Sequence, residues 1–485
     1  MCVAALILAA CSATESAAKE TLRAKPNVVI IFTDDQGWAD IGTQGAEGFE
    51  TPHLDRLAGE GTRFSNFYVA QPVCSASRMA LLTGCYPNRL GMHGAIGPRA
   101  KHGIHDEETT IAELCKSQGY ATAMFGKWHL GYQTQFLPAN HGFDESNGIP
   151  YSNDMWPWHP AYAKFSDPVV KRKRGYPDLF QFEGTEIVDP IVTAEDQMRF
   201  TTDFGDRAAA FVHKHADEPF FLYLAHPMPH VPLFTAETSK GRSAQGAYGD
   251  VIEEIDDSVG KVLAALEQNG LTDDTIVIYA ADNGPWLNYG DHAGNVGPLR
   301  EGKGTTFEGG VRVPCLVRYP GQVPAGRVSN VPWMTIDVLP TVARLIGADL
   351  PERVIDGVDA WPLLSGAPGA GSPQPAYFFY YHTNQLEALR KGPWKLHFPH
   401  GYRSMVGQVP GSGGSPGKYD YSAKTGLELY NLEQDISESE NLVERHPAVV
   451  AQLVELADRM RSRLGDKLTG VVGSENRKPG RVPAE

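Results

Sequence analysis

Cysteine, positive charge and long apolar runs are all scarce in this sequence of 485 residues. Its 43 Lys and Arg against 58 Asp and Glu give a formal net charge of −15. A chain this acidic is not expected to bind nucleic acid or to attract a polyanion over a long range. Any selectivity for an anionic ligand must therefore come from a few residues placed locally.

The cysteine content excludes a disulfide framework, because only six are present and they are widely spaced. Two lie in the first eleven residues and one lies in a motif described below. The other three are expected to be buried thiols, with the first two as the pair to check for a bond: Cys85, Cys115 and Cys315.

The N-terminus carries a short apolar run, residues 3–10, followed by Cys11. This pattern is typical of a bacterial lipobox, in which Cys11 receives a lipid, and it predicts that residues 1–23 are an export signal and linker. No Lys or Arg precedes the run, and the run is brief, as it would be if the start codon were placed too far downstream. We expect an exported protein, periplasmic or anchored to the outer membrane, whose membrane contact is the lipid on Cys11.

The rest of the chain predicts two domains. Apolar runs without two-residue alternation, separated by helical patterns, are typical of parallel strands buried on both faces, so residues 24–368 are expected to form an α/β domain. A linker rich in Gly, Pro and Ser follows Leu364. Residues 369–470 are expected to form a small α+β domain with an antiparallel sheet and a closing helix, and residues 471–485 a disordered tail. Residues 401–422 are rich in glycine and predict a flexible insertion near the cleft.

Four of the predicted strands end in polar side chains. Residues 27–33 stop at Asp34 and Asp35, residues 275–281 at Asp282 and Asn283, residues 220–225 before His226 and His230, and residues 120–125 before Lys127 and His129. Because sites in open α/β sheets lie beyond the carboxyl ends of the strands, these side chains are expected at one rim.

A metal site is expected among them. Asp34, Asp35, Asp282 and Asn283 offer only oxygen, the ligand that Ca²⁺ and Mg²⁺ prefer, and calcium is the better choice. Carboxylates crowded together without a cation would repel one another. For any one Asp taken alone, a turn or a helix cap is the competing interpretation.

The most informative motif is Cys74-Ser75-Ala76-Ser77-Arg78, followed by Leu81-Leu82-Thr83-Gly84. It opens a predicted helix, whose free backbone N–H groups suit a sulfate. The motif resembles the signature of the formylglycine-dependent (type I) sulfatases of the arylsulfatase A and N-acetylgalactosamine-6-sulfatase kind. Ala76 stands where proline is more common in that family. The resemblance extends from about residue 25 to about residue 464.

The resemblance implies the fold and the nucleophile. The fold would be alkaline-phosphatase-like, a large mixed sheet flanked by helices with a smaller C-terminal domain. A maturation enzyme would oxidise Cys74 to formylglycine (3-oxoalanine), and one hydroxyl of its hydrated form, a gem-diol, would attack sulfur. Cys74 would then also count among the calcium ligands, and Asp282 would help to deprotonate the attacking oxygen.

The resemblance also implies roles for the basic side chains. Arg78 would orient the gem-diol, Lys127 would stabilise charge, and His129 would be the base that returns the aldehyde. His230 would bind sulfate and protonate the leaving oxygen. Lys303, in the glycine-rich stretch 299–310, would contact the sulfate, with Gly302 and Gly304 allowing close approach to an anion.

Residues 150–160 are dense in aromatic and polar side chains, and we nominate Asn153, Asp154 and His159 as substrate contacts. The competing interpretation is a proline-pinned loop with buried tryptophans. The basic run at residues 171–174 is either a solvated loop or a polysaccharide contact.

These patterns together predict a calcium-dependent sulfatase that acts on a sulfated sugar of a polysaccharide or glycosaminoglycan. Its partners would be that substrate and the maturation enzyme. A formylglycine-dependent phosphodiesterase or phosphonate hydrolase is the alternative, since phosphate and sulfate are near isosteres. An unmodified, non-catalytic carbohydrate-binding protein is the alternative from another class.

Overall fold

The computed structural model describes residues 25–162 and 175–483. The N-terminal segment with Cys11 and the basic run at residues 171–174 lie outside the described residues, so their roles stay predictions. Within the described part of the chain, no helix is both long and apolar enough to cross a membrane.

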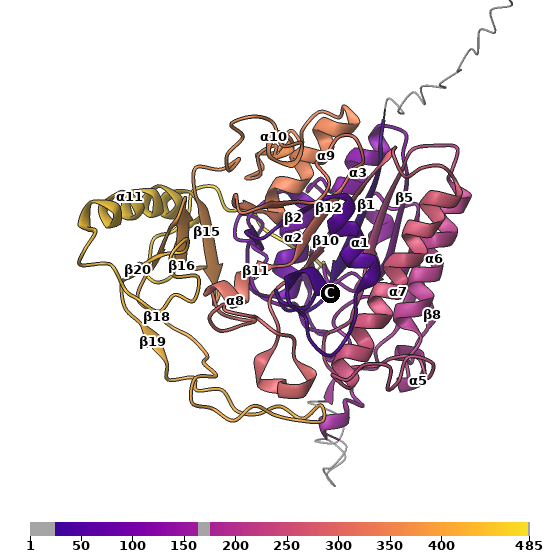
Figure 1. The fold of residues 1–485 in the computed structure, drawn as a ribbon, viewed down its shortest axis with the longest axis horizontal. Helices are drawn as coiled ribbons and strands as arrows, with labels where there is room; N and C mark the ends of the chain where they lie inside the picture. Colours follow the sequence, from indigo (N-terminus) through magenta and orange to yellow (C-terminus); the bar gives the residue numbers. More distant parts are fainter. Residues whose placement is uncertain (1–24, 163–174, 484–485) are drawn as a thin grey trace, which may run out of the picture.

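A large mixed sheet forms the centre of the first domain (Figure 1). Its central strands β10, β1, β9 and β5 run parallel, as the apolar runs predict, while β12 is antiparallel to β10. From edge to edge the strands are β13 (Arg327–Ser329), β2 (Thr62–Phe64), β12 (Cys315–Arg318), β10 (Thr275–Ala281), β1 (Asn27–Thr33), β9 (Phe220–Ala225), β5 (Ala121–Lys127), β6 (Glu145–Ile149), β7 (Gln181–Glu183) and β8 (Glu186–Asp189).

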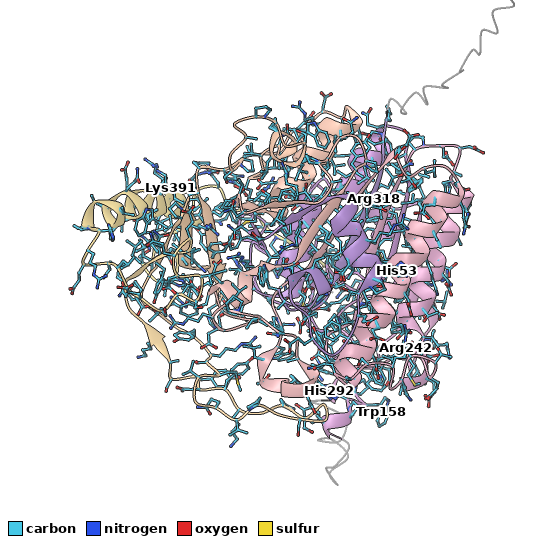
Figure 2. The ribbon with its side chains drawn as sticks, in the orientation of Figure 1. His53, Trp158, Arg242, His292, Arg318 and Lys391 are labelled. Carbon is cyan, nitrogen blue, oxygen red and sulfur yellow. The ribbon has the colours of Figure 1, made fainter. Side chains whose placement is uncertain are left out.

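Helices cover both faces of this sheet, and side chains fill the space between the layers (Figure 2). Strand β1 shows why: Val28, Ile30 and Phe32 belong to one core, and Val29 and Ile31 belong to the other. On the first face pack α2 (Cys74–Thr83), α3 (Ile111–Ser117) and α9 (Val338–Ile346). On the second pack α1 (Pro52–Glu60), α6 (Phe200–Lys214) and α7 (Ala247–Gln268).

Shorter elements complete the first domain. They are α5 (Ala194–Gln197), α8 (Glu308–Val311) and α10 (Trp361–Leu364), a small sheet of β11 (Arg312–Val313), β3 (Phe67–Tyr68) and β14 (Trp333–Met334), and the 3-10 turns η1 (Gly42–Gln44), η2 (Thr134–Phe136), η3 (Pro138–Asn140), η4 (Pro160–Tyr162), η6 (Leu287–His292) and η7 (Thr335–Asp337).

The second domain is a four-stranded antiparallel sheet with one long helix. The sheet runs in the order β15 (Tyr377–Tyr381), β16 (Gln385–Lys391), β17 (Trp394–His397) and β20 (Glu428–Asn431), and the helix is α11 (Pro447–Leu464). A separate ribbon pairs β18 (His400–Gly401) with β19 (Lys424–Thr425). The predicted fold class, a large α/β sheet with a small antiparallel domain, is confirmed.

The end of the chain differs from the expected disordered tail. The amides of Ser474 and Glu475 donate to carbonyls at the end of α11, and the chain then reaches the first domain, where β21 (Gly480–Arg481) pairs with β4 (His102–Gly103). Glu475 accepts from Arg89 at 2.9 Å, and Arg477 lies 3.3 Å from Glu108. These two side chains supply ion-pair partners for the first domain.

Candidate active site

The carboxyl ends of β1, β10, β9 and β5 meet at one edge of the large sheet. Backbone hydrogen bonds fix them there: the amide of Asp282 donates to Thr33 O at 3.0 Å, and that of Asp34 donates to Met228 O at 3.2 Å. Strand β5 continues through Lys127, beyond its predicted end. Lys127 is therefore held by a strand and not by a loop.

Asp34, Asp35 and Asp282 each contribute one carboxylate oxygen to a cluster whose atoms lie within 4.8 Å of one another. Asp35 has a φ of 63°, a left-handed conformation uncommon outside glycine. Its amide donates to Asp282 Oδ1 at 3.2 Å, and Asn283 Nδ2 donates to Asp35 Oδ1 at 2.6 Å. The structure thus brings the four predicted oxygen ligands together.

Buried cations compensate these carboxylates. Arg78 Nε donates to Asp282 Oδ2 at 3.0 Å, and its Nη1 donates to Lys127 O at 3.2 Å. The guanidinium carbon also lies 5.6 Å above the ring of Phe32. Each carboxylate has one close cationic partner: Asp34 has Lys127, Asp35 has Lys303 and Asp282 has Arg78.

Burial and the charges of the cluster shift the pKa values of two of its carboxylates in opposite directions. Burial raises the pKa of Asp34, but the charges of Lys127, His230 and Arg78 outweigh it and hold the pKa well below its usual range. Burial and the negative charge of Asp34 raise the pKa of Asp282 to about 7. Neighbouring carboxylates ionise together only where enough positive charge surrounds them.

Three buried oxygens in this cluster lack a hydrogen-bond partner among the described residues: Asp34 Oδ1, Asp35 Oδ2 and Asn283 Oδ1. Leaving such atoms unpaired is costly, and oxygen from carboxylates and amides is what a hard cation binds. The residues present therefore fit a calcium ion.

Cys74 is the first residue of α2, as the motif predicts, and its side chain is buried. Lys303 Nζ lies 3.6 Å from its sulfur, and the ligand atoms of Asp34 and His230 lie within 4.8 Å. Burial raises the pKa of the thiol to about 11, although Lys127 and Lys303 oppose this. At neutral pH the thiol is protonated and is a weak nucleophile. The cysteines outside this site that the structure describes are free and buried, as expected.

Two histidines contact the site from different segments. His129, with a φ of 62°, donates from Nε2 to Ile96 O at 2.9 Å. Since burial lowers its pKa and favours the neutral ring, the buried Nδ1 is left as a proton acceptor without a hydrogen bond. His230 donates from Nδ1 to Val231 O at 2.6 Å, and its Nε2 lies 3.6 Å from Asp35 Oδ2.

His226 contacts a neighbouring helix and not the carboxylate cluster. It is fully buried, and its Nε2 lies 3.1 Å from Ser258 Oγ on α7. Its pKa is lowered to about 3 by burial and by Arg78.

The glycines beside Lys303 serve a different purpose from the expected approach to an anion. A Cβ on Gly302 would lie 2.5 Å from Pro285 O, and one on Gly304 would lie 2.4 Å from Arg403 Nη2. Both glycines make room for neighbouring protein groups, which fix the backbone that carries Lys303.

The nominated substrate contacts are placed as follows. Asn153 is fully buried, and its Nδ2 donates to Gln197 Oε1 at 3.2 Å and to Pro232 O at 3.1 Å. These contacts favour a role in holding the loop. Burial and the charge of Lys303 lower the pKa of His230, and Asp154 is close enough to that ring to oppose the shift. His159 Nδ1 accepts from the amide of Ala161 at 3.2 Å.

Sequence reasoning missed three side chains beside the site. The ring of Trp286 lies 5.5 Å from that of His230 and 5.0 Å from Lys303 Nζ. Arg403 Nε donates to Lys303 O at 2.8 Å, and Tyr381 packs against the apolar group that includes Cys74. Arg403 and Tyr381 belong to the second domain, and no local pattern connected them to the strand ends.

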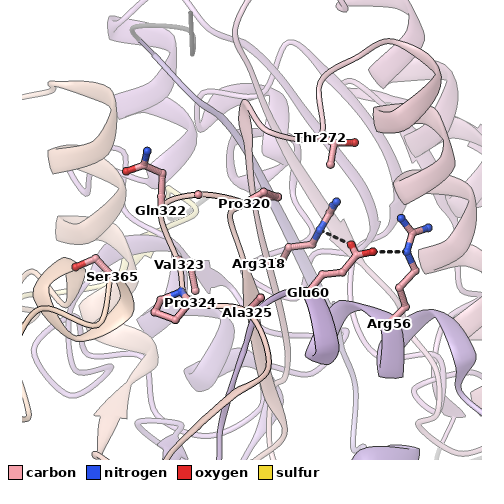
Figure 3. A pocket seen from close by; sticks show the side chains of 11 residues that line it. Arg56, Glu60, Thr272, Arg318, Pro320, Gln322, Val323, Pro324, Ala325 and Ser365 are labelled. Carbon is pink, nitrogen blue, oxygen red and sulfur yellow. Dashed lines mark hydrogen bonds and ion pairs between the residues drawn. The ribbon is translucent and has the colours of Figure 1, made fainter. Parts of the chain in front are cut away.

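A hollow of about 620 Å³ lies elsewhere and contains none of these residues (Figure 3). It is lined by Arg318, whose Nε lies 2.8 Å from Glu60, and Glu60 also pairs with Arg56 at 2.7 Å. Arg318 ends β12 opposite Val277, near the start of β10. The hollow is therefore at the opposite edge of the sheet from the strand ends that carry the site.

Comparison with known proteins gives consistent matches. A family model described as Sulfatase matches residues 26–348, and one described as the C-terminal region of aryl-sulfatase matches residues 373–476. The chain is 39% identical to arylsulfatase A of Bos taurus over 393 residues, 77% of this chain and 75% of that protein. It is 38% identical to N-acetylgalactosamine-6-sulfatase of Canis lupus familiaris over 391 residues, 77% of this chain and 72% of that one.

Among solved structures, the PsFucS1 sulfatase from Pseudoalteromonas sp. superposes with a TM-score of 0.80 at 28% sequence identity. The match covers 90% of each chain.

Proposed function

Because this chain belongs to the sulfatase family and is a sulfuric ester hydrolase, we propose that its substrate is a sulfated sugar of a polysaccharide or glycosaminoglycan. The observation that carries this proposal is Cys74 at the start of a helix, within reach of Lys303 and of the carboxylate cluster. The name of the relative N-acetylgalactosamine-6-sulfatase supports a sugar substrate.

The proposed nucleophile is a hydrated formylglycine, a gem-diol, made from Cys74 by a maturation enzyme. The buried thiol supports this, because a pKa of about 11 leaves it neutral at physiological pH. A thiol that attacked sulfur would also form an adduct with no easy release.

The proposed cofactor is calcium, held by Asp34, Asp35, Asp282 and Asn283 together with the residue formed from Cys74. When bound, it supplies positive charge that polarises the sulfate group. The side chains of Lys127, Arg78 and Lys303 are already fixed by ion pairs, so they add positive charge without reorganisation.

Proton transfer is assigned to the two histidines. His129 takes a proton at Nδ1, because its Nε2–H is committed to Ile96 O. His230 acts at Nε2, because its Nδ1–H is committed to Val231 O. We assign to His230 the protonation of the leaving oxygen.

Sulfate release from a panel of sulfated mono- and oligosaccharides tests the proposal, with protein co-expressed with a formylglycine-generating enzyme and residue 74 checked by mass spectrometry. Cys74→Ala should abolish release. Cys115→Ala, which makes the same change at a buried thiol outside the site, should retain it.

Three results would count against the proposal. Full activity of Cys74→Ala would remove the nucleophile assignment. Hydrolysis of phosphodiesters or phosphonates, without sulfate release by aldehyde-bearing protein, would favour the alternative hydrolase. Sugar binding by protein that is never matured would favour a non-catalytic role.

The N-terminal sequence supports the separate proposal that the protein is exported and lipidated at Cys11. Labelled fatty acid should enter the wild-type protein in a bacterial host and should not enter Cys11→Ser. Labelling of both would contradict it.

A further inference from the structure

A second hollow, of about 630 Å³, lies on the C-terminal domain. Three basic and three tyrosine side chains contribute to its lining: His382, Arg403, Lys467, Tyr381, Tyr402 and Tyr421. Among the described residues that line it, none is acidic. In a chain with a net charge of −15, such a group of basic side chains is an exception.

This hollow adjoins the candidate active site through side chains that both share. Tyr381 lines the hollow and packs against the group containing Cys74. The guanidinium carbon of Arg403 lies 5.8 Å above the ring of Trp286, the ring that also contacts Lys303 and His230. The hollow and the candidate active site are therefore neighbours, and Tyr381 and Arg403 border both.

Arg403 is held in place before any ligand arrives. Its Nε donates to Lys303 O at 2.8 Å, and its guanidinium carbon lies 4.9 Å above the ring of Tyr419. The absence of a side chain at Gly304 makes room for the guanidinium. Its Nη1 makes no hydrogen bond within the described part of the chain, so this donor is available to an acidic group.

The acidic residues near the hollow already have partners. Glu387, which is fully buried, lies 2.9 Å from His382 Nδ1 and accepts from Thr306 Oγ1 at 3.1 Å. Asp466, next to Lys467, pairs with Arg461 at 2.8 Å. Neither carboxylate lines the hollow.

The hairpin that forms one wall has a strained backbone. His382, Thr383 and Asn384, between β15 and β16, have φ values of 44°, 59° and 69°. Asn384 fixes the turn, since its Nδ2 donates to Leu464 O at 2.9 Å and its carbonyl accepts from the amide of Lys467 at 2.8 Å. Three consecutive left-handed residues without glycine are unfavourable, so the contacts of Asn384 are needed to hold this hairpin turn.

We propose that this hollow binds a second acidic group, a carboxylate or a sulfate, on the sugar chain that carries the scissile sulfate. Arg403 is the principal contact, Lys467 adds charge, and the partly buried Tyr381 and Tyr402 and the exposed Tyr421 offer ring faces for the sugar. The inference rests on the proposed function, because it places the scissile sulfate at Cys74. The preferred substrate is then a saccharide with two acidic groups.

Matched pairs of saccharides test the inference. In one pair the members differ by a uronic acid carboxylate, reduced to the alcohol in the control, and in the other by a second sulfate. For wild-type protein we expect kcat/KM to be about tenfold or more higher for the diacidic member of at least one pair, the gain typical of one charge-assisted hydrogen bond. The pair that shows this difference in kcat/KM identifies the second acidic group as a carboxylate or as a sulfate.

Variants test whether Arg403 and Lys467 cause the preference for the diacidic saccharide. Arg403→Gln and Lys467→Gln should reduce the preference for the diacidic member, chiefly through KM. Lys391→Gln is the matched control: it removes the same charge at the opposite end of β16 from the strained hairpin, near α11 in Figure 2, and should leave the preference unchanged. The inference would be overturned if wild-type protein had equal kcat/KM values for the two members of both pairs. It would also be overturned if Arg403→Gln lowered kcat/KM equally for the diacidic and the monoacidic member.

Binding separates this inference from the proposed chemistry. Calorimetry with Cys74→Ala protein should show tighter binding of the same diacidic member, and equal affinities would overturn the subsite. If no saccharide releases sulfate but the affinities differ, the proposed function fails while the subsite stands.

Discussion

At the scale of single residues, the site is a balance of buried charges. Asp34, Asp35 and Asp282 each have one close cationic partner, yet three of the oxygens in the cluster are unpaired. Removing one partner of a buried ion pair leaves an uncompensated charge, which costs more than the pair contributes. A bound divalent cation would give the three unpaired oxygens a partner.

Calcium should therefore stabilise the folded protein as well as support activity. Adding calcium to chelator-treated protein, at about a hundred times its dissociation constant, should raise the free energy of unfolding by about 2.7 kcal/mol. Asp282→Asn should weaken the calcium dependence of the melting temperature. Asp206→Asn, an exposed acid paired with Lys261 at 2.6 Å, should retain it. An unchanged calcium response in Asp282→Asn would contradict the ligand assignment.

At the scale of elements, close backbone contacts between strands set the position of the site. A Cβ on Gly126, near the end of β5, would lie 1.9 Å from Ala225 O at the end of β9. A Cβ on Gly148 of β6 would likewise lie 1.7 Å from Gly126 O. These glycines allow the strand ends that carry Lys127 and His226 to lie side by side.

Gly126→Ala should destabilise the fold through this contact. Gly119→Ala is a matched control, because Gly119 also has a positive φ, 81°, but nothing lies within 4 Å of its Cβ position. We expect Gly119→Ala to cost about 1–2 kcal/mol from backbone strain, and Gly126→Ala to cost roughly 1–3 kcal/mol more from overpacking. Urea unfolding measures both losses of stability. Equal losses would contradict the prediction, because they would show that the backbone moves to accommodate the added methyl group at residue 126.

At the scale of the whole molecule, a buried ion network joins the two domains. Lys395 on β17 lies 2.8 Å from Glu308 of α8 and 3.0 Å from Glu438. His397 Nε2 is 2.8 Å from the same Glu438 oxygen, and Tyr68 donates to Glu308 at 2.7 Å. Because this network is fully buried, separation of the domains would expose or strand its charges.

Lys395→Met should weaken both domains together. It leaves two carboxylates buried without their shared cation, a loss of about 3–5 kcal/mol. Lys391→Met, on the neighbouring strand and partly exposed, should change stability by less than about 0.5 kcal/mol. Two separate unfolding transitions in wild-type protein, monitored by domain-specific hydrogen exchange, would contradict this coupling.

The same network predicts a pH dependence of stability. Burial raises the pKa of Glu438 to about 7 from its ordinary 4.5, although Lys395 opposes this. Burial also raises the pKa of Glu308, but Lys395 and Arg312 outweigh it and lower that pKa to about 2. A carboxyl whose pKa is higher folded than unfolded stabilises the protein at acid pH and loses that contribution as pH rises.

Glu438→Gln should remove this loss. The free energy of unfolding of the variant, relative to wild type, should rise between about pH 4.5 and pH 7, the interval between the ordinary and the shifted pKa of Glu438. Glu440→Gln, at an exposed acid paired with Arg445, should give a flat difference. Denaturant unfolding across this interval measures both, and a falling difference for Glu438→Gln would contradict the assignment.

Much of the site could be predicted from the sequence. Asp34, Asp282, Lys127 and His129 each follow a predicted apolar run, so their placement depends on strand periodicity and on the common direction of parallel strands. Cys74 could be placed because its motif opens a helix, which depends on neighbours in the chain. Local patterns therefore determined the fold class and the chemical groups at the strand ends.

Only the tertiary structure decided the rest. It assigned Gly302 and Gly304 to protein contacts, brought Arg403 and Tyr381 of the second domain to the site, and paired β21 at the end of the chain with β4 of the first domain. These contacts join residues far apart in the chain, and no periodicity or short motif encodes which distant surfaces meet. The sequence by itself determined which groups do the chemistry, and the packing of the domains decided what surrounds them.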